Sequence, residues 1–170
     1  MLPIILESSR LRVAVAGAGE GLTRRLGMLA AAGVAKPAIF TQRLPEPNEI
    51  ATFSVLFVAG LGDEESTRLA AMARAARVLV NVEDRPALCD FHVPAQVRRG
   101  DLCITVSTGG RSPALSRIVR ERIEADIGPE WDRHLDEISD ARAKWRDAGL
   151  EPDEISQRTR ALVLDKGWVT

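Results

Sequence analysis

The stretch "LRVAVAGAGEGL", residues 11–22, joins a short apolar run to three closely spaced glycines. The run predicts a buried strand over 11–16, and a helical spacing of apolar residues follows it and ends at Gly33. Glycines between a strand and a helix leave free amides at the helix N-terminus, where a dinucleotide pyrophosphate can bind. The residues predicted to line this cofactor site are Gly17, Ala18, Gly19, Glu20 and Gly21.

The same turn departs from the usual dinucleotide fingerprint. Leu22 stands where a third glycine or an alanine is usual, and Gly21 lies one place early. The second predicted strand, 38–41, is followed by Gln42 and Arg43 and not by an acidic residue for a ribose hydroxyl. A glycine turn that binds nothing is therefore the alternative interpretation. Arg43 suits either a ribose phosphate or solvent, so the sequence does not distinguish NAD from NADP.

Further strands follow along the chain. The segment "FSVLFVAG" at 53–60 is continuously apolar, which is typical of a strand buried on both faces of a parallel sheet. A helix is expected from Asp63, a fourth strand over 77–82 and a fifth over 102–107. Strands that alternate with helices predict an α/β fold with a Rossmann-like, mostly parallel sheet over residues 1–112.

The character of the chain changes after Ser112 and Pro113, which suit the cap and the first position of a helix. The charged segment that follows carries a thin apolar stripe, made of Trp131, Leu135, Ile138 and Trp145. So thin a stripe needs the sheet domain or a second copy to pack against. We expect residues 113–170 to form a helical region for dimerisation and substrate capping.

Composition narrows the classes of partner. The 170 residues include 23 basic and 24 acidic side chains, so nucleic acid and anionic membranes are not expected as main partners. The segment "MLPIILESSR" resembles neither a signal peptide nor a membrane span. Cys89 and Cys103 lie far apart with only two histidines to join them, so no metal site is expected. These features indicate a cytoplasmic protein.

A polar cluster, "NVEDRP" at 81–86, follows the fourth predicted strand. Open α/β sheets bind ligands at this edge, and a carboxylate there could act as a general base. In an extended segment Glu83 and Asp84 would point to opposite sides, so only one of them should face a ligand. The sequence leaves the choice open, and a plain polar turn is the alternative.

A third candidate site lies in "VSTGGRSPALSRIVRERIE", residues 106–124. The pair Gly109 and Gly110 lets the backbone approach a ligand closely, and the helix that follows offers amides and a positive dipole end. Guanidinium groups that could bind carboxylates or phosphates come from Arg111, Arg117 and Arg120. The alternative is a solvated arginine face paired with Glu121 and Glu124.

Together these segments resemble the precorrin-2 dehydrogenase / sirohydrochlorin ferrochelatase family, found as the N-terminal module of siroheme synthases. The resemblance covers roughly residues 2–125, beginning at "LPIIL" and passing through "VAVAGAGEG". It is most specific over "VLVNVEDRPALCDFHVPAQVRRGDLCITVSTGGRSPALSRIVRERIE".

The resemblance implies an NAD-dependent oxidation of precorrin-2, a reduced tetrapyrrole with several carboxylates, to sirohydrochlorin. It also implies a homodimer, and some members insert Fe²⁺. Asp84 matches the family's essential aspartate and would be the general base, while Gly60 and Asn81 would join the cofactor site. The substrate would contact Asn81, Thr108, Gly109, Gly110, Arg111, Ser112 and Arg117.

The departures from the family lie on the cofactor side. They are Leu22, the turn "GLGD" at 60–63, and a short connection between the second and third strands. Two other functions therefore remain open. One is a non-redox chelatase or tetrapyrrole-binding protein with a degenerate NAD site, and the other is a regulatory module that senses dinucleotides.

Overall fold

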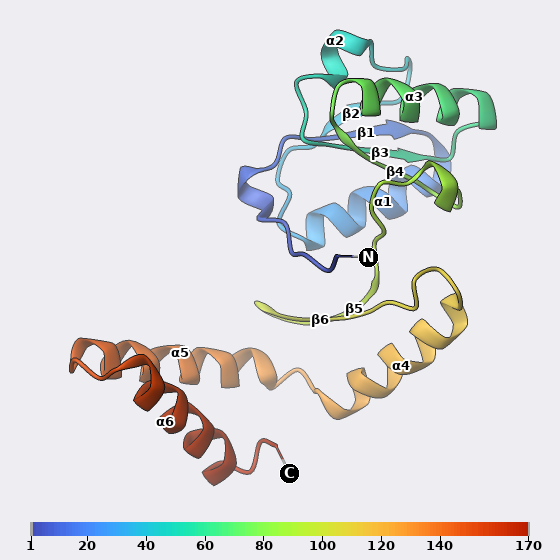
Figure 1. The fold of residues 1–170 in the computed structure, drawn as a ribbon. Helices are drawn as coiled ribbons and strands as arrows, with labels where there is room; N and C mark the ends of the chain where they lie inside the picture. The colour runs from blue at the N-terminus through green and yellow to red at the C-terminus, as the bar shows by residue number, and fades with distance from the viewer. Residues whose placement is uncertain (1, 170) are drawn as a thin grey trace. The chain divides into compact units, whose positions relative to one another are not determined.

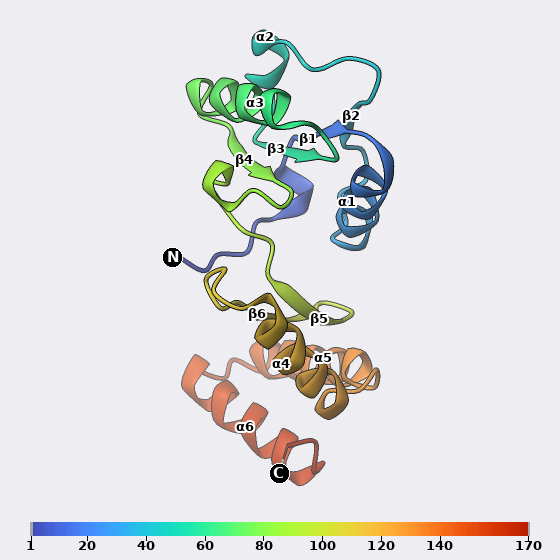
Figure 2. The same ribbon diagram turned by 90° about the vertical axis from the view of Figure 1, so that its right-hand side faces the viewer.

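The computed structural model describes residues 2–169, and the chain divides into two compact units between Val93 and Pro94. The first unit holds a sheet with helices on both faces, and the second holds a β-hairpin and three long helices (Figures 1 and 2). No helix within residues 2–169 combines the length and the apolar character needed to cross a membrane.

The first unit is built on a parallel four-stranded sheet in the order β2-β1-β3-β4. Its strands are β1 (Val13–Gly17), β2 (Ala38–Phe40), β3 (Val55–Ala59) and β4 (Leu79–Val82). Because Gly17 pairs with Ala59 and Val58 with Val82, the carboxyl ends of β1, β3 and β4 meet at one edge of the sheet. The Rossmann-like fold class predicted from the sequence is confirmed.

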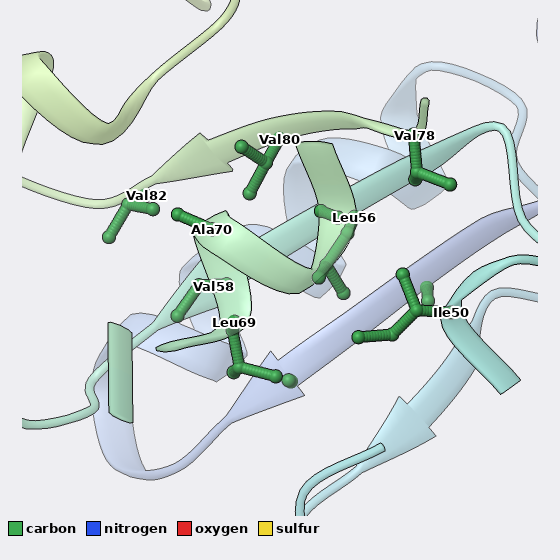
Figure 3. Packing of buried hydrophobic residues seen from close by; sticks show 11 residues of the cluster. Ile50, Leu56, Val58, Leu69, Ala70, Val78, Val80 and Val82 are labelled. Atoms are coloured by element: carbon green, nitrogen blue, oxygen red, sulfur yellow. The ribbon is translucent and has the colours of Figure 1, made fainter. Parts of the chain in front are cut away.

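Two long helices cover the two faces of this sheet (Figure 1). Successive residues of β1 and β3 point to opposite faces of the sheet. They pack against α1 (Gly19–Ala31) on one face and against α3 (Asp63–Ala75) on the other. Figure 3 shows the α3 side, where Leu69 and Ala70 meet Leu56, Val58 and Val80 with no exposed surface beyond 1%. Shorter elements are η1 (Ser8–Arg10), α2 (Pro47–Ile50) and η2 (Pro86–Leu88).

The second unit begins with an antiparallel hairpin, β5 (Ala95–Arg99) and β6 (Leu102–Val106), followed by α4 (Pro113–Asp126), α5 (Trp131–Asp147) and α6 (Pro152–Asp165). Its interior is thin, with Val97 and Ile155 as its buried apolar residues among those described. The expected helical region is present. Its last residues are held by aromatic stacking, since the His134 ring lies 4.0 Å from that of Trp168.

The prediction that 102–107 forms a fifth strand of the parallel sheet is wrong, because β6 pairs with β5. The sequence analysis missed β5 since only Val97 of "AQVRR" is buried. The two-residue turn between the strands holds Gly100 at φ +55°, a typical hairpin signal. The boundary between the two compact units, at Val93 and Pro94, lies earlier in the chain than the expected boundary after residue 112. The outermost residues of the expected ranges, 1 and 170, lie outside the described residues.

Candidate functional site

The glycine turn brings the ends of β1 and β3 into direct backbone contact. A Cβ on Gly17 would lie 2.1 Å from the carbonyl oxygen of Ala59, whose oxygen accepts a 3.1 Å hydrogen bond from the Ala18 amide. Gly60 has φ +67°, and a Cβ there would lie 2.2 Å from the Ala18 oxygen. Only glycine therefore fits at Gly17 and Gly60, where the backbones at the ends of β1 and β3 lie in contact.

Gly19, in contrast, has open space where a side chain would begin. This residue begins α1 with φ +61°, and a Cβ added to it would meet nothing within 4 Å. The N-cap residue Ala18 makes no side-chain hydrogen bond to the first turn, so the first amides of α1 keep no capping partner. Free amides at the positive end of a helix, with room beside a glycine, fit a pyrophosphate.

Glu83 faces the first turn of α1. A Cβ on the buried Gly21 would lie 2.2 Å from Glu83 Oε2 and 3.1 Å from the Gly60 amide nitrogen. Gly21 therefore provides the close helix packing that the third glycine of the fingerprint usually gives. Arg24 fixes the Glu83 carboxylate through a 3.3 Å ion pair and lies 3.6 Å from Glu20, whose side chain is exposed.

Asp84, by contrast, is exposed and has a left-handed backbone with φ +58°. No hydrogen bond or ion pair joins its carboxylate to another residue of 2–169. The structure thus separates the two neighbouring acids, since Glu83 is held against α1 and the exposed Asp84 carboxylate has no partner among residues 2–169.

Arg85 fixes the turn that carries Asp84. Its Nη1 donates to the Leu61 oxygen at 3.1 Å and to Ser66 Oγ at 2.6 Å, and its Nη2 pairs with Asp63. These bonds join the end of β4 to the loop between β3 and α3. Sequence reasoning gave Arg85 no such part, because its partners lie about twenty residues earlier in the chain.

Asn81 is turned into the first unit. Its side chain is 6% exposed, and its Nδ2 donates a 2.9 Å hydrogen bond to the Phe91 oxygen. Its buried Oδ1 has no partner among the described residues. Asn81 therefore fixes the chain beyond β4, and its predicted contacts with cofactor and substrate remain predictions.

Arg43 lies at the end of β2, with its guanidinium carbon 5.4 Å from the centre of the Phe40 ring. Its two terminal nitrogens each donate a 2.6 Å hydrogen bond to Glu49, one to each carboxylate oxygen. The hydrogen bonds from Arg43, together with one from the Glu46 amide, lower the pKa of Glu49 to about 2.

This pair predicts an acid-dependent loss of stability. Because the folded-state pKa of Glu49 is below its ordinary value of 4.5, its contribution is complete above that value and disappears as the pH falls towards about 2. Glu49→Gln should remove this contribution, so the difference in free energy of unfolding between wild type and variant should shrink over that window. Urea titrations at pH 6, 4 and 3 measure it, and a constant difference would contradict the prediction.

In the second unit, residues 108–111 form a tight turn. Gly109 and Gly110 have φ +66° and +79°, and the Arg111 amide donates to the Thr108 oxygen at 3.2 Å. Thr108 Oγ1 accepts a 3.1 Å hydrogen bond from the Ser112 amide. Ser112 caps α4 through a 3.2 Å bond from the Leu115 amide, and Pro113 opens the helix, as the sequence predicts. The Thr108 side chain therefore closes the turn around the glycine pair, and the Ser112 side chain caps the helix that follows.

The arginines of this segment differ in their environments. Arg111 is exposed and forms no ion pair within residues 2–169. Arg117 pairs with Glu121 at 2.9 Å, which lowers the pKa of that carboxyl, and Arg120 pairs with Glu124. Arg117 and Arg120 thus show the pairing expected of a solvated face, while Arg111 is available to an external anion.

The predicted site residues therefore form two groups. The glycine turn, Gly60 and Asp84 share the carboxyl edge of the parallel sheet in the first unit. Thr108 to Ser112 and Arg117 lie around the start of α4 in the second. Within residues 2–169, no group of three histidine, cysteine or acidic residues is arranged to hold a metal ion.

Comparison with known proteins agrees with this division. Residues 4–95 match the family described as "Putative NAD(P)-binding", and residues 99–126 match "Sirohaem biosynthesis protein central". The chain has the fold of SirC, a precorrin-2 dehydrogenase, with a TM-score of 0.73 at 17% identity over 100% of this chain and 93% of that one.

Curated relatives share more of the sequence. The siroheme synthase of Methylococcus capsulatus is 36% identical over 169 residues, which is 89% of this chain and 36% of the relative. The siroheme biosynthesis protein met8 of Schizosaccharomyces pombe is 33% identical over 98 residues, 58% of this chain and 37% of that protein. The chain spans about a third of the length of the siroheme synthases it matches. It belongs to the precorrin-2 dehydrogenase / sirohydrochlorin ferrochelatase family, which includes the N-terminal module of siroheme synthases.

Proposed function

We propose that this chain is an NAD-dependent precorrin-2 dehydrogenase. The observation that carries the proposal is the free, exposed carboxylate of Asp84 at the same sheet edge as the open turn at Gly19. An acid without a partner beside a site that fits a pyrophosphate is what an oxidation by hydride and proton loss requires. The naming of the relatives for siroheme biosynthesis supports the choice of substrate.

In the proposed reaction, precorrin-2 loses a hydride and a proton and becomes sirohydrochlorin, while NAD⁺ becomes NADH. The bound nicotinamide supplies the hydride acceptor, since no amino-acid side chain takes up hydride. Asp84 accepts the proton from the macrocycle and releases it to water. The amides of the first α1 turn hold the pyrophosphate, and Arg85 keeps the Asp84 turn in place.

The tetrapyrrole carries several carboxylates, and the start of α4 offers groups that bind them. The Gly110 amide has no hydrogen-bond partner among residues 2–169, whereas the Gly109 amide donates to Ser107 Oγ at 3.3 Å. Arg111 adds a guanidinium group without an internal partner. These residues form the proposed substrate-binding set, together with Thr108, Ser112 and Arg117.

We also propose that the chain acts as a homodimer. Leu115, Ile118 and Val119 of α4 are 49%, 61% and 37% exposed, and the second unit buries few apolar side chains among the described residues. Apolar residues spaced along one helix face, beside so thin an interior, are suited to a second copy of the chain.

An anaerobic absorbance assay with precorrin-2, with and without NAD⁺, tests the proposed reaction. The expected result is formation of sirohydrochlorin that requires NAD⁺, with NADH produced in equal amount. Binding of sirohydrochlorin without affinity for NAD⁺ would favour a chelatase or carrier, and adding Fe²⁺ to sirohydrochlorin tests metal insertion. Binding of NAD⁺ without affinity for either tetrapyrrole would favour a regulatory module.

Substrate binding at α4 is testable with a matched pair of arginines. Arg117 and Arg122 are both 78% exposed and both pair with an acid one turn later. Arg117→Ala should raise the KM for precorrin-2 about tenfold, the worth of one charge-assisted hydrogen bond, with little change in kcat. Arg122→Ala should change neither, and an equal effect of both variants would identify a solvated arginine face.

A further inference from the structure

The sequence shows no acidic residue directly after β2, where many dinucleotide-binding folds place a carboxylate for the ribose hydroxyls. The structure supplies one from another element. Glu49 of α2 lies at this position because Arg43 holds both of its carboxylate oxygens, while the Arg43 guanidinium covers the ring of Phe40, the last residue of β2. The end of β2 thus carries an ion pair and not a free cation.

We propose that the Arg43–Glu49 pair sets the cofactor choice of this chain, favouring NAD⁺, which has free ribose hydroxyls, over NADP⁺, which has a 2′-phosphate. The inference rests on the proposed function, because it assumes that a dinucleotide binds along the edge of the parallel sheet. It concerns the end of β2, which pairs with β1 through Ala16 and Phe40 and so adjoins the glycine turn.

The physical reason is competition for one guanidinium group. A 2′-phosphate is normally bound by an arginine that can donate two parallel hydrogen bonds. Both terminal nitrogens of Arg43 already donate to Glu49, at 2.6 Å each. A phosphate would have to break this pair, and the released carboxylate of Glu49 would then repel it. Ribose hydroxyls, in contrast, can donate to a carboxylate without displacing the arginine.

The other charges around Arg43 do not favour a phosphate either. A cavity of about 450 Å³ beside Arg43 is also lined by Arg68 of α3. Glu46 and Glu65 line the same cavity, so its two basic side chains are balanced by two acidic ones. Glu49 adds a further negative charge at this edge, since a carboxylate with even the ordinary pKa of 4.5 is ionised at neutral pH. The local charge therefore disfavours an additional dianion.

Binding of NAD⁺ and NADP⁺ to the full chain, measured by isothermal titration calorimetry, tests the inference. Wild type should bind NAD⁺ at least about tenfold more tightly than NADP⁺, the effect of one hydrogen bond to a charged group. Glu49→Gln keeps the side-chain shape but frees Arg43, so it should improve NADP⁺ binding about tenfold. The double variant Glu49→Gln, Arg43→Gln should lose this gain.

Glu65→Gln is the matched control, since it removes one negative charge from the cavity beside Arg43 and leaves the Arg43–Glu49 pair intact. An equal gain in NADP⁺ affinity from Glu65→Gln would overturn the inference, as would equal binding of both dinucleotides by wild type. In both cases NAD⁺ binding would survive, and the proposed function with it. Failure of wild type to bind either dinucleotide would overturn the inference and the proposed function together.

Discussion

Replacing Asp84 with asparagine should slow the formation of sirohydrochlorin by about 10²–10⁴-fold, the usual contribution of a general base. Asparagine keeps the size of the side chain and tolerates the left-handed backbone at φ +58°. The variant therefore removes the proton acceptor alone. Its kcat in the anaerobic absorbance assay should fall, while its urea midpoint and its NAD⁺ affinity should match those of wild type.

Glu83→Gln provides the comparison. Glu83 is bound to Arg24 and lies against Gly21, so its loss should leave kcat close to that of wild type. If Glu83→Gln were inactive and Asp84→Asn active, Glu83 would be the base. Asp84→Ala is a poorer test than asparagine, because alanine in a left-handed conformation costs about 1 kcal/mol of stability.

The fold of the first unit could be predicted because its strands are continuous apolar runs. Residues 13–17 and 55–59 are buried at every position. The first run ends at Gly17 and the second is followed by Gly60, and the backbone geometry requires glycine at both positions. The β5–β6 hairpin gave a weaker pattern. Its first strand buries one side chain, Val97, so no alternation of apolar and polar residues marked it, and its best signal was the turn at Gly100.

For the candidate site, the sequence located the backbone turns but not the side-chain pairs. The glycine turn and the acidic pair Glu83 and Asp84 could be found from local motifs, while the choice of Asp84 came from the family resemblance. The pair of Arg24 with Glu83 joins residues 59 positions apart, and Arg85 reaches a serine 19 positions away. Even Arg43 and Glu49, only 6 positions apart, meet because α2 turns back towards β2. Such pairs depend on the folded path of the chain, which composition and periodicity do not record.

The second large effect concerns the backbone contact between the ends of β1 and β3 at Gly60. Gly60→Ala should lower the free energy of unfolding by about 3 kcal/mol, from the cost of a left-handed alanine added to that of overpacking. The added Cβ would lie 2.2 Å from the carbonyl oxygen of Ala18, a backbone atom that cannot rotate away, at a residue with φ +67°. The loss is a large part of the stability of a typical domain.

Gly27→Ala is the matched control for this substitution. Gly27 lies in the exposed face of α1, and a Cβ there would meet nothing within 4 Å. Because alanine is the better helix former, this variant should gain up to about 1 kcal/mol. Urea unfolding followed by circular dichroism measures both changes. If Gly60→Ala were as stable as wild type, the ends of β1 and β3 could not lie as close as the structure places them, and the cofactor turn built on that contact would need another geometry.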